Sequence, residues 1–261
     1  MPLGSTVKVT GAAIFDREPS VVLPAIKVCC ERGTGTSGGA RLRFMPLTFA
    51  GTLDRSAATA AAFQLVDLVG SDLVADAWDR ESALPGMTVG GLTRHLVSQP
   101  ECAVDFLTTP GPAGAPLLSL VGHYDLVDWL AAPVGAPENT SIRDEFNQLG
   151  SAGHTDSVAV LARSLEQLDS AIAAAGPTTY VPWQHCALPT DDFLVVRAME
   201  MVVHADDLAC SVGMSAPEFS PGVLEPALAL LAALAARRHG QDAVLRTLSR
   251  RERTTGPVSA F

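Results

Sequence analysis

Residues 191–212 read DDFLVVRAMEMVVHADDLACSV. Its apolar side chains cover nearly every direction around a helix, which is typical of a helix buried on most sides. The acidic pair at its start suits the positive end of a helix dipole, and the preceding Thr190 is a natural side-chain cap. The stretch therefore predicts a long, largely buried helix.

A single polar stripe interrupts the apolar surface of this helix. At about 100° per residue, its members fall within an arc of about 80°. They are Arg197, Glu200, His204 and Asp207. Polar side chains on a buried helix need partners inside the protein, so the stripe is the first candidate for a functional site.

Glu200 and His204 lie four residues apart, so a carboxylate oxygen and an imidazole nitrogen can meet at one point. That geometry suits two ligands of a divalent metal, and the alternative is a simple helix pair. A third ligand must come from another helix, and the best candidate is His95, two turns after Thr88. A lone helical histidine is more often a satisfied core or surface residue. Two histidines and a carboxylate could also hold Fe(II) for oxygen chemistry.

Outward from this stretch, the sequence predicts three other long helices, with Pro and Gly breaks between them. They cover Ala58–Trp78, Thr88 to about Thr109, and Asp156–Ala175. Pro100 lies inside the second, where we expect a kink or a break. Weaker helical patterns cover Leu117–Ala131, Gly222–Arg238 and Gln241–Arg250. The predicted fold class is all-α: a four-helix bundle within residues 45–213, followed by a C-terminal helical extension over residues 214–261.

The first 44 residues differ in composition from the rest of the chain. They hold six Lys or Arg residues against three acids, and a Gly/Thr/Ser run over Gly33–Gly39. We interpret residues 1–44 as a loosely ordered extension, with Met45 as an alternative start of the protein. The other interpretation is a short hairpin or arm that docks on the body.

The overall composition excludes several classes of protein. Hydrophobic residues make up 48% of the chain, which argues against general disorder, and the net charge of −10 argues against nucleic-acid binding. The longest apolar run, Val223–Ala236, is too short to span a bilayer, and the start of the chain does not resemble a signal peptide. Five cysteines without a C-x-x-C spacing argue against a disulfide framework. We expect a cytoplasmic protein with no nucleic-acid or membrane partner.

Two motifs resemble a known family. Residues 84–96, LPGMTVGGLTRHL, resemble the LPGWT-V-x-D-L-x-x-HL entrance of the mycothiol-dependent maleylpyruvate isomerase family, within the DinB-like superfamily. Residues 197–207 resemble its R-x-x-E-x-x-x-H-x-x-D helix, and residues 250–261 are similar to the tails of its actinobacterial members. The resemblance covers about Met45–Gly213. It implies a DinB-like four-helix bundle whose metal is held at one end by His95, Glu200 and His204.

The resemblance also implies a function. The metal would be Zn²⁺ or another divalent ion, and it would activate mycothiol or water for transfer, isomerisation or hydrolysis of a small organic substrate. The other stripe residues are the expected catalytic residues: Arg197 would orient Glu200 or an anionic substrate, and Asp207 would contact the free nitrogen of His204. The alternative is a non-catalytic metal- or small-ligand-binding bundle, which could form a homodimer.

The sequence differs from the family motif at two places in the second predicted helix and just before it. Met87 stands where the family usually has Trp, and Gly90-Gly91 replaces a helix-favouring pair, so we expect the second helix to start late. A few other polar and aromatic residues could line the mouth of a pocket, although loop packing is the simpler interpretation. These are His123, Tyr124, Trp183, Gln184 and His185.

Overall fold

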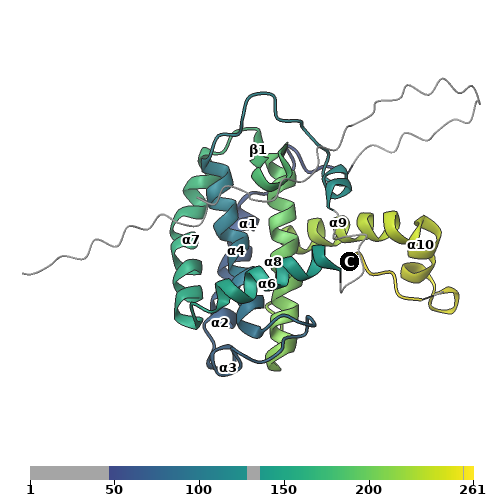
Figure 1. Cartoon of the computed structure of the whole chain (residues 1–261). Helices are drawn as coiled ribbons and strands as arrows, with labels where there is room; N and C mark the ends of the chain where they lie inside the picture. Colours follow the sequence, from purple (N-terminus) through teal and green to yellow (C-terminus); the bar gives the residue numbers. More distant parts are fainter. Residues whose placement is uncertain (1–46, 128–135, 255) are drawn as a thin grey trace, which may run out of the picture. The chain divides into compact units, whose positions relative to one another are not determined.

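The predicted central helix forms as α8 (Thr190–Val212) in the computed structural model of the chain (Figure 1). The structure describes residues 47–127, 136–254 and 256–261. The predicted extension over residues 1–44 therefore lies outside the described residues, and its boundary with the bundle stays a prediction.

The start of α8 differs from the expectation in one respect. Thr190 is the first helical residue and not a cap, because its hydroxyl donates to the carbonyl of Gly176 at 2.7 Å; the capping prediction is wrong. The carboxylates of Asp191 and Asp192 accept hydrogen bonds from residues 48–55. These bonds fix the beginning of the described chain to the N-terminal end of α8.

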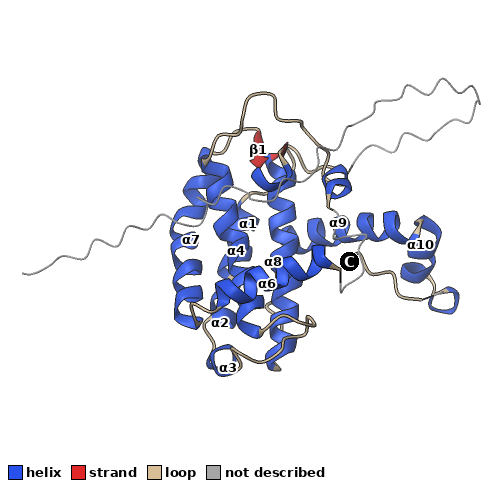
Figure 2. Ribbon diagram, viewed as in Figure 1, coloured by secondary structure: helices blue, strands red, loops and turns tan. Residues whose placement is uncertain are grey.

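Four helices build the bundle: α1 (Ser56–Phe63), α4 (Val89–Thr108), α7 (His154–Ala174) and α8. α4 packs against α7 and α8, and α1 packs against the same two helices. Figure 2 shows that helices dominate the described chain. The core between them contains leucines of α4 and the apolar surface of α8. The all-α prediction is confirmed, and so are the predicted second, third and fourth helices, apart from shifts of one or two residues at their ends.

α4 begins at Val89, directly after Thr88, and continues unbroken through Pro100. The hydroxyl of Thr88 accepts a hydrogen bond from the backbone N–H of Gly91 at 2.9 Å and so caps the helix. The expectation of a late start is wrong. Of the kink or break expected at Pro100, the break does not form, and the kink stays a prediction. The glycine pair serves packing instead: a Cβ on Gly90 would lie 2.6 Å from the ring of Trp78, and one on Gly91 would lie 2.3 Å from Oδ1 of Asn147.

Asn147 belongs to α6 (Pro137–Gly150), a helix that the sequence analysis missed. α6 packs against α4, and the two backbones approach most closely where Gly150 meets Gly90. The Gly150 carbonyl also accepts a hydrogen bond from Nε1 of Trp78 at 2.9 Å. The glycines therefore allow two helices to cross within backbone contact.

Replacing Gly150 with alanine is expected to lower the free energy of unfolding by about 1–3 kcal/mol. A Cβ there would lie 2.8 Å from the carbonyl carbon of Gly90, and backbone cannot give way as a flexible side chain can. Chemical denaturation measures the loss. Gly176→Ala is the control, because a Cβ at that position meets nothing within 4 Å. Equal stability of the two variants would contradict the close crossing.

The predicted first long helix, Ala58–Trp78, is wrong as a single element. It forms three short helices, α1, α2 (Val66–Val69) and α3 (Asp72–Asp76). Ser71 begins the last of these, since its Oγ accepts a hydrogen bond from the backbone N–H of Val74 at 3.3 Å. A local cap of this kind ends helical continuity, although the spacing of apolar residues continues.

The predicted short helix Leu117–Ala131 is also wrong. Leu117 lies extended and forms a parallel bridge with Ala187, and only a 3₁₀ helix, η1 (Gly122–Leu126), forms within the described part of that range. Ala187 belongs to a small antiparallel hairpin, β1 (Thr178–Val181) with β2 (Cys186–Pro189), whose tip contains the 3₁₀ helix η2 (Pro182–Gln184). Register pairs Val181 with Cys186 next to this tip.

Two C-terminal helices form as predicted, α9 (Pro221–His239) and α10 (Gln241–Ser249), followed by η3 (Arg251–Arg253). α9 packs on α8 and α1, and α10 packs on α9. Among the described residues, no helix combines the length and the apolar character needed to cross a bilayer.

Candidate metal centre

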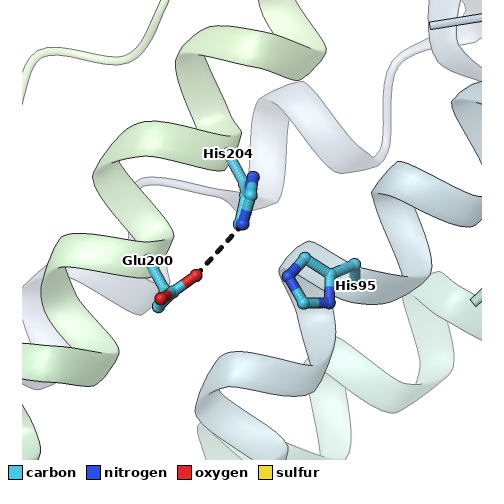
Figure 3. Close-up of side chains that lie close together, drawn as sticks. All are labelled: His95, Glu200 and His204. Carbon is cyan, nitrogen blue, oxygen red and sulfur yellow. Dashed lines mark hydrogen bonds and ion pairs between the residues drawn. The ribbon is translucent and has the colours of Figure 1, made fainter. Parts of the chain in front are cut away.

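Three side chains from two helices meet at one place in the bundle (Figure 3). His95 comes from α4, and Glu200 and His204 come from successive turns of α8. One donor atom of each lies within 4.8 Å of the other two, and the ring centroids of the two histidines are 4.5 Å apart. The structure thus brings together the three residues that the sequence predicted as metal ligands. We call them the triad.

His204 is held between two carboxylates. Its Nε2 lies 3.1 Å from Oε2 of Glu200, and its Nδ1 lies 3.1 Å from Oδ2 of Asp207. Asp207 thereby orients the imidazole so that Nε2 faces the triad, as outer carboxylates do for metal-binding histidines. The expected contact between Asp207 and the free nitrogen of His204 is present, whereas the neighbouring Asp206 is exposed.

The triad has a defined charge state near neutral pH. Burial alone would raise the pKa of Glu200, but the hydrogen bond and charge of His204, with the charge of Arg197, lower it to about 2. Burial alone would lower the pKa of His204, but the hydrogen bonds to Asp207 and Glu200 raise it to about 9. Burial and the charge of His204 lower the pKa of His95 to about 3. Glu200 is therefore ionised, His204 protonated and His95 neutral.

Arg197, the first residue of the stripe, is almost fully buried. Its Nη1 donates to Oε1 of Gln99 at 2.7 Å, and the Gln99 amide donates to the carbonyl of His95 at 2.9 Å. The rings of Trp183 and Phe193 lie 5.9 and 5.7 Å from its guanidinium carbon. Gln99 thus connects the stripe to the helix of His95. The sequence analysis missed this contact, because no local signal connects residues 98 positions apart.

The donor set fits a divalent metal. Two imidazoles and one carboxylate are typical ligands of Zn²⁺ and of related ions. Nδ1 of His95 is buried and has no hydrogen-bond partner among the described residues. The ring of Phe146 packs on the His95 ring, with the two ring centroids 4.2 Å apart. The side chains of Glu200 and His204 remain 16% and 15% exposed, so the triad is in contact with solvent.

The residues considered for a pocket mouth divide into two groups. His123 and Tyr124 are buried on η1, and the side chain of Gln184 hydrogen-bonds to His123. His185 is exposed at the hairpin tip, where its Nδ1 lies 3.4 Å from the hydroxyl of Tyr180. Trp183 lies against Arg197, as described above.

Two of the described cysteines have thiols whose pKa is raised. Burial raises the pKa of Cys102 to about 11, and burial also raises the pKa of Cys186. A thiol with a raised pKa is a poor nucleophile at neutral pH, so neither thiol competes with the triad as a reactive centre.

Comparison with known proteins gives one match. The family model described as mycothiol maleylpyruvate isomerase N-terminal domain matches residues 58–209, which include the whole triad, Arg197 and Asp207. No curated protein and no solved structure gives a significant match. The matched range also contains all four helices of the bundle except the ends of α1 and α8.

Proposed function

The chain belongs to the mycothiol maleylpyruvate isomerase N-terminal domain family, and from this premise we propose that it is a divalent-metal-dependent enzyme acting with a low-molecular-weight thiol. Mycothiol is the proposed thiol, a small organic molecule is the proposed second substrate, and the cytoplasm is the proposed location. The observation that carries the proposal is the triad itself. Among the described residues it brings together three protein ligands, and it stays in contact with solvent, as catalytic metal sites do.

Each residue of the site has a proposed role. His95, Glu200 and His204 hold Zn²⁺ or another divalent ion, and Asp207 keeps Nε2 of His204 turned toward it. When bound, such an ion supplies Lewis acidity, which lowers the pKa of a thiol or water at its open positions and provides a nucleophile at neutral pH. Arg197 is a positioning residue whose charge adds to the hydrogen bond and charge of His204 in lowering the pKa of Glu200. It would also attract an anionic substrate.

Mycothiol is expected to raise the melting temperature of the Zn²⁺-loaded protein and to leave that of the chelator-treated protein unchanged. The reason is that the thiol binds at the metal, and a ligand that binds only the folded form stabilises it. Thermal denaturation of the two forms, at a metal content fixed by elemental analysis, measures the difference.

Two outcomes would contradict the proposal. An equal rise in both forms would show that the thiol binds elsewhere. A metal-dependent rise without turnover would favour the alternative of a non-catalytic binding bundle. Turnover is measured in two assays: the change in absorbance of maleylpyruvate in the presence of mycothiol, and the transfer of the thiol to other electrophiles.

A further inference from the structure

Two buried polar atoms on η1 lack partners. They are Nδ1 of His123 and the hydroxyl of Tyr124, and neither has a hydrogen-bond partner among the described residues. Each side chain is only 5% exposed. Buried polar groups are nearly always paired, because an unpaired one pays the full cost of desolvation. A bound ligand would supply the missing partners.

These two residues are linked to the polar stripe of α8. The hairpin tip connects them: Gln184 hydrogen-bonds to His123, and the adjacent Trp183 lies against the guanidinium of Arg197, one turn before Glu200. Burial lowers the pKa of His123 and raises that of Tyr124, and the charge of Glu200 opposes the first change and adds to the second. The rings of His123 and Tyr124 also contact each other, with centroids 4.9 Å apart.

The hydrogen-bonding roles of the two atoms follow from their surroundings. Nδ1 of His123 has no hydrogen-bond partner among the described residues, whereas the same imidazole hydrogen-bonds to the side chain of Gln184. Burial lowers the pKa of His123 to about 4, so the imidazole is neutral and can accept one hydrogen bond. Burial raises the pKa of Tyr124, which keeps its hydroxyl protonated and able to donate.

We propose that His123 and Tyr124 bind a neutral, hydroxyl- or amide-bearing part of the ligand whose thiol lies at the triad. An O–H or N–H of the ligand donates to Nδ1 of His123, and a hydroxyl or carbonyl oxygen accepts from Tyr124. A carboxylate fits less well, because it has no hydrogen to donate to Nδ1. This inference rests on the proposed function and adds the class of group that the site recognises beyond the thiol.

Tyr124→Phe is the sharpest test, since it removes one oxygen atom. The probes are 1-thioglycerol and 1-propanethiol, which differ only in their two hydroxyl groups, and calorimetry measures their binding to the Zn²⁺-loaded full chain. The wild type is expected to bind 1-thioglycerol about tenfold more tightly than 1-propanethiol. Tyr124→Phe is expected to remove most of that preference while leaving the affinity for 1-propanethiol unchanged.

The same variant separates a binding role from a structural one. Removing an unpaired buried hydroxyl should raise the melting temperature of the ligand-free protein, even as binding of 1-thioglycerol weakens. Tyr180→Phe is the matched control: it alters the only other tyrosine of the chain, whose hydroxyl contacts His185 on the hairpin, and should keep the preference.

Each contrary outcome has a distinct meaning. If Tyr124→Phe weakens both thiols equally, or leaves the preference intact, the inference is wrong while the proposed function stands. If the wild type binds both thiols with equal affinity, the inference is likewise wrong. If neither thiol binds the Zn²⁺-loaded wild type, the proposed function fails, and the inference fails with it.

Discussion

Zn²⁺ is expected to raise the melting temperature of the wild type, and replacing any one of His95, Glu200 and His204 with alanine is expected to abolish this rise. The two remaining ligands hold a divalent ion poorly. The affinity should therefore fall by more than about 100-fold, since loss of an outer partner of a ligand alone costs about 10- to 100-fold. Thermal denaturation with and without Zn²⁺ measures the loss, because a ligand at 100 times its Kd stabilises the folded form by about 2.7 kcal/mol.

His185→Ala is the control for these variants. His185 is an exposed histidine at the hairpin tip, so its loss should leave the Zn²⁺-dependent rise intact. The double variant His95→Ala/His204→Ala should bind little more weakly than either single variant, because the site is already broken. A His95→Ala protein that keeps stoichiometric metal, while His204→Ala loses it, would show that the site between α4 and α8 is wrong. His123 would then be the next candidate ligand.

The polar stripe could be found from the sequence because it depends on one helix. The angular positions of Glu200, His204 and Asp207 follow from helical geometry alone, and the structure shows the two hydrogen bonds among them. His95 is different. Its place two turns after the Thr88 cap follows from local signals and made it the best candidate for a third ligand, and the resemblance to a family implied the same residue. Its proximity to α8, however, depends on tertiary packing, which no local signal gives.

The missed parts of the fold share a physical cause. α6 carries a mostly polar sequence, and it is placed by its close crossing with α4 at Gly90, Gly91 and Gly150. In the sequence, a glycine pair indicates a low helix propensity. In the folded protein, the same pair lacks the Cβ atoms that would hold two helices apart. The partners of Arg197, namely Gln99 and Trp183, are likewise set by packing across the bundle.

Zn²⁺ affinity is expected to fall about tenfold for each pH unit below about 9. In the metal-free protein His204 carries a proton on Nε2, and its pKa is raised to about 9 by the bonds to Asp207 and Glu200. A metal needs the lone pair of that nitrogen, so binding displaces the proton. His95 and Glu200 contribute none at neutral pH, because their pKa values are about 3 and 2. Calorimetry in buffers of different ionisation enthalpy should therefore find one proton released per ion at pH 7.

The stability of the metal-free protein should depend on pH through the same proton on His204. The pKa of about 9 for His204 lies above the ordinary value of 6.5, so the protonated residue stabilises the metal-free fold fully below pH 6.5, and this stability is lost as pH rises through 9. The Zn²⁺-bound protein holds His204 without that proton. The difference in melting temperature between the two forms should therefore grow from pH 6.5 to pH 9, and less steeply in Asp207→Asn, which loses one of the two acceptors. A constant difference across this range would show that His204 is neutral before the metal binds.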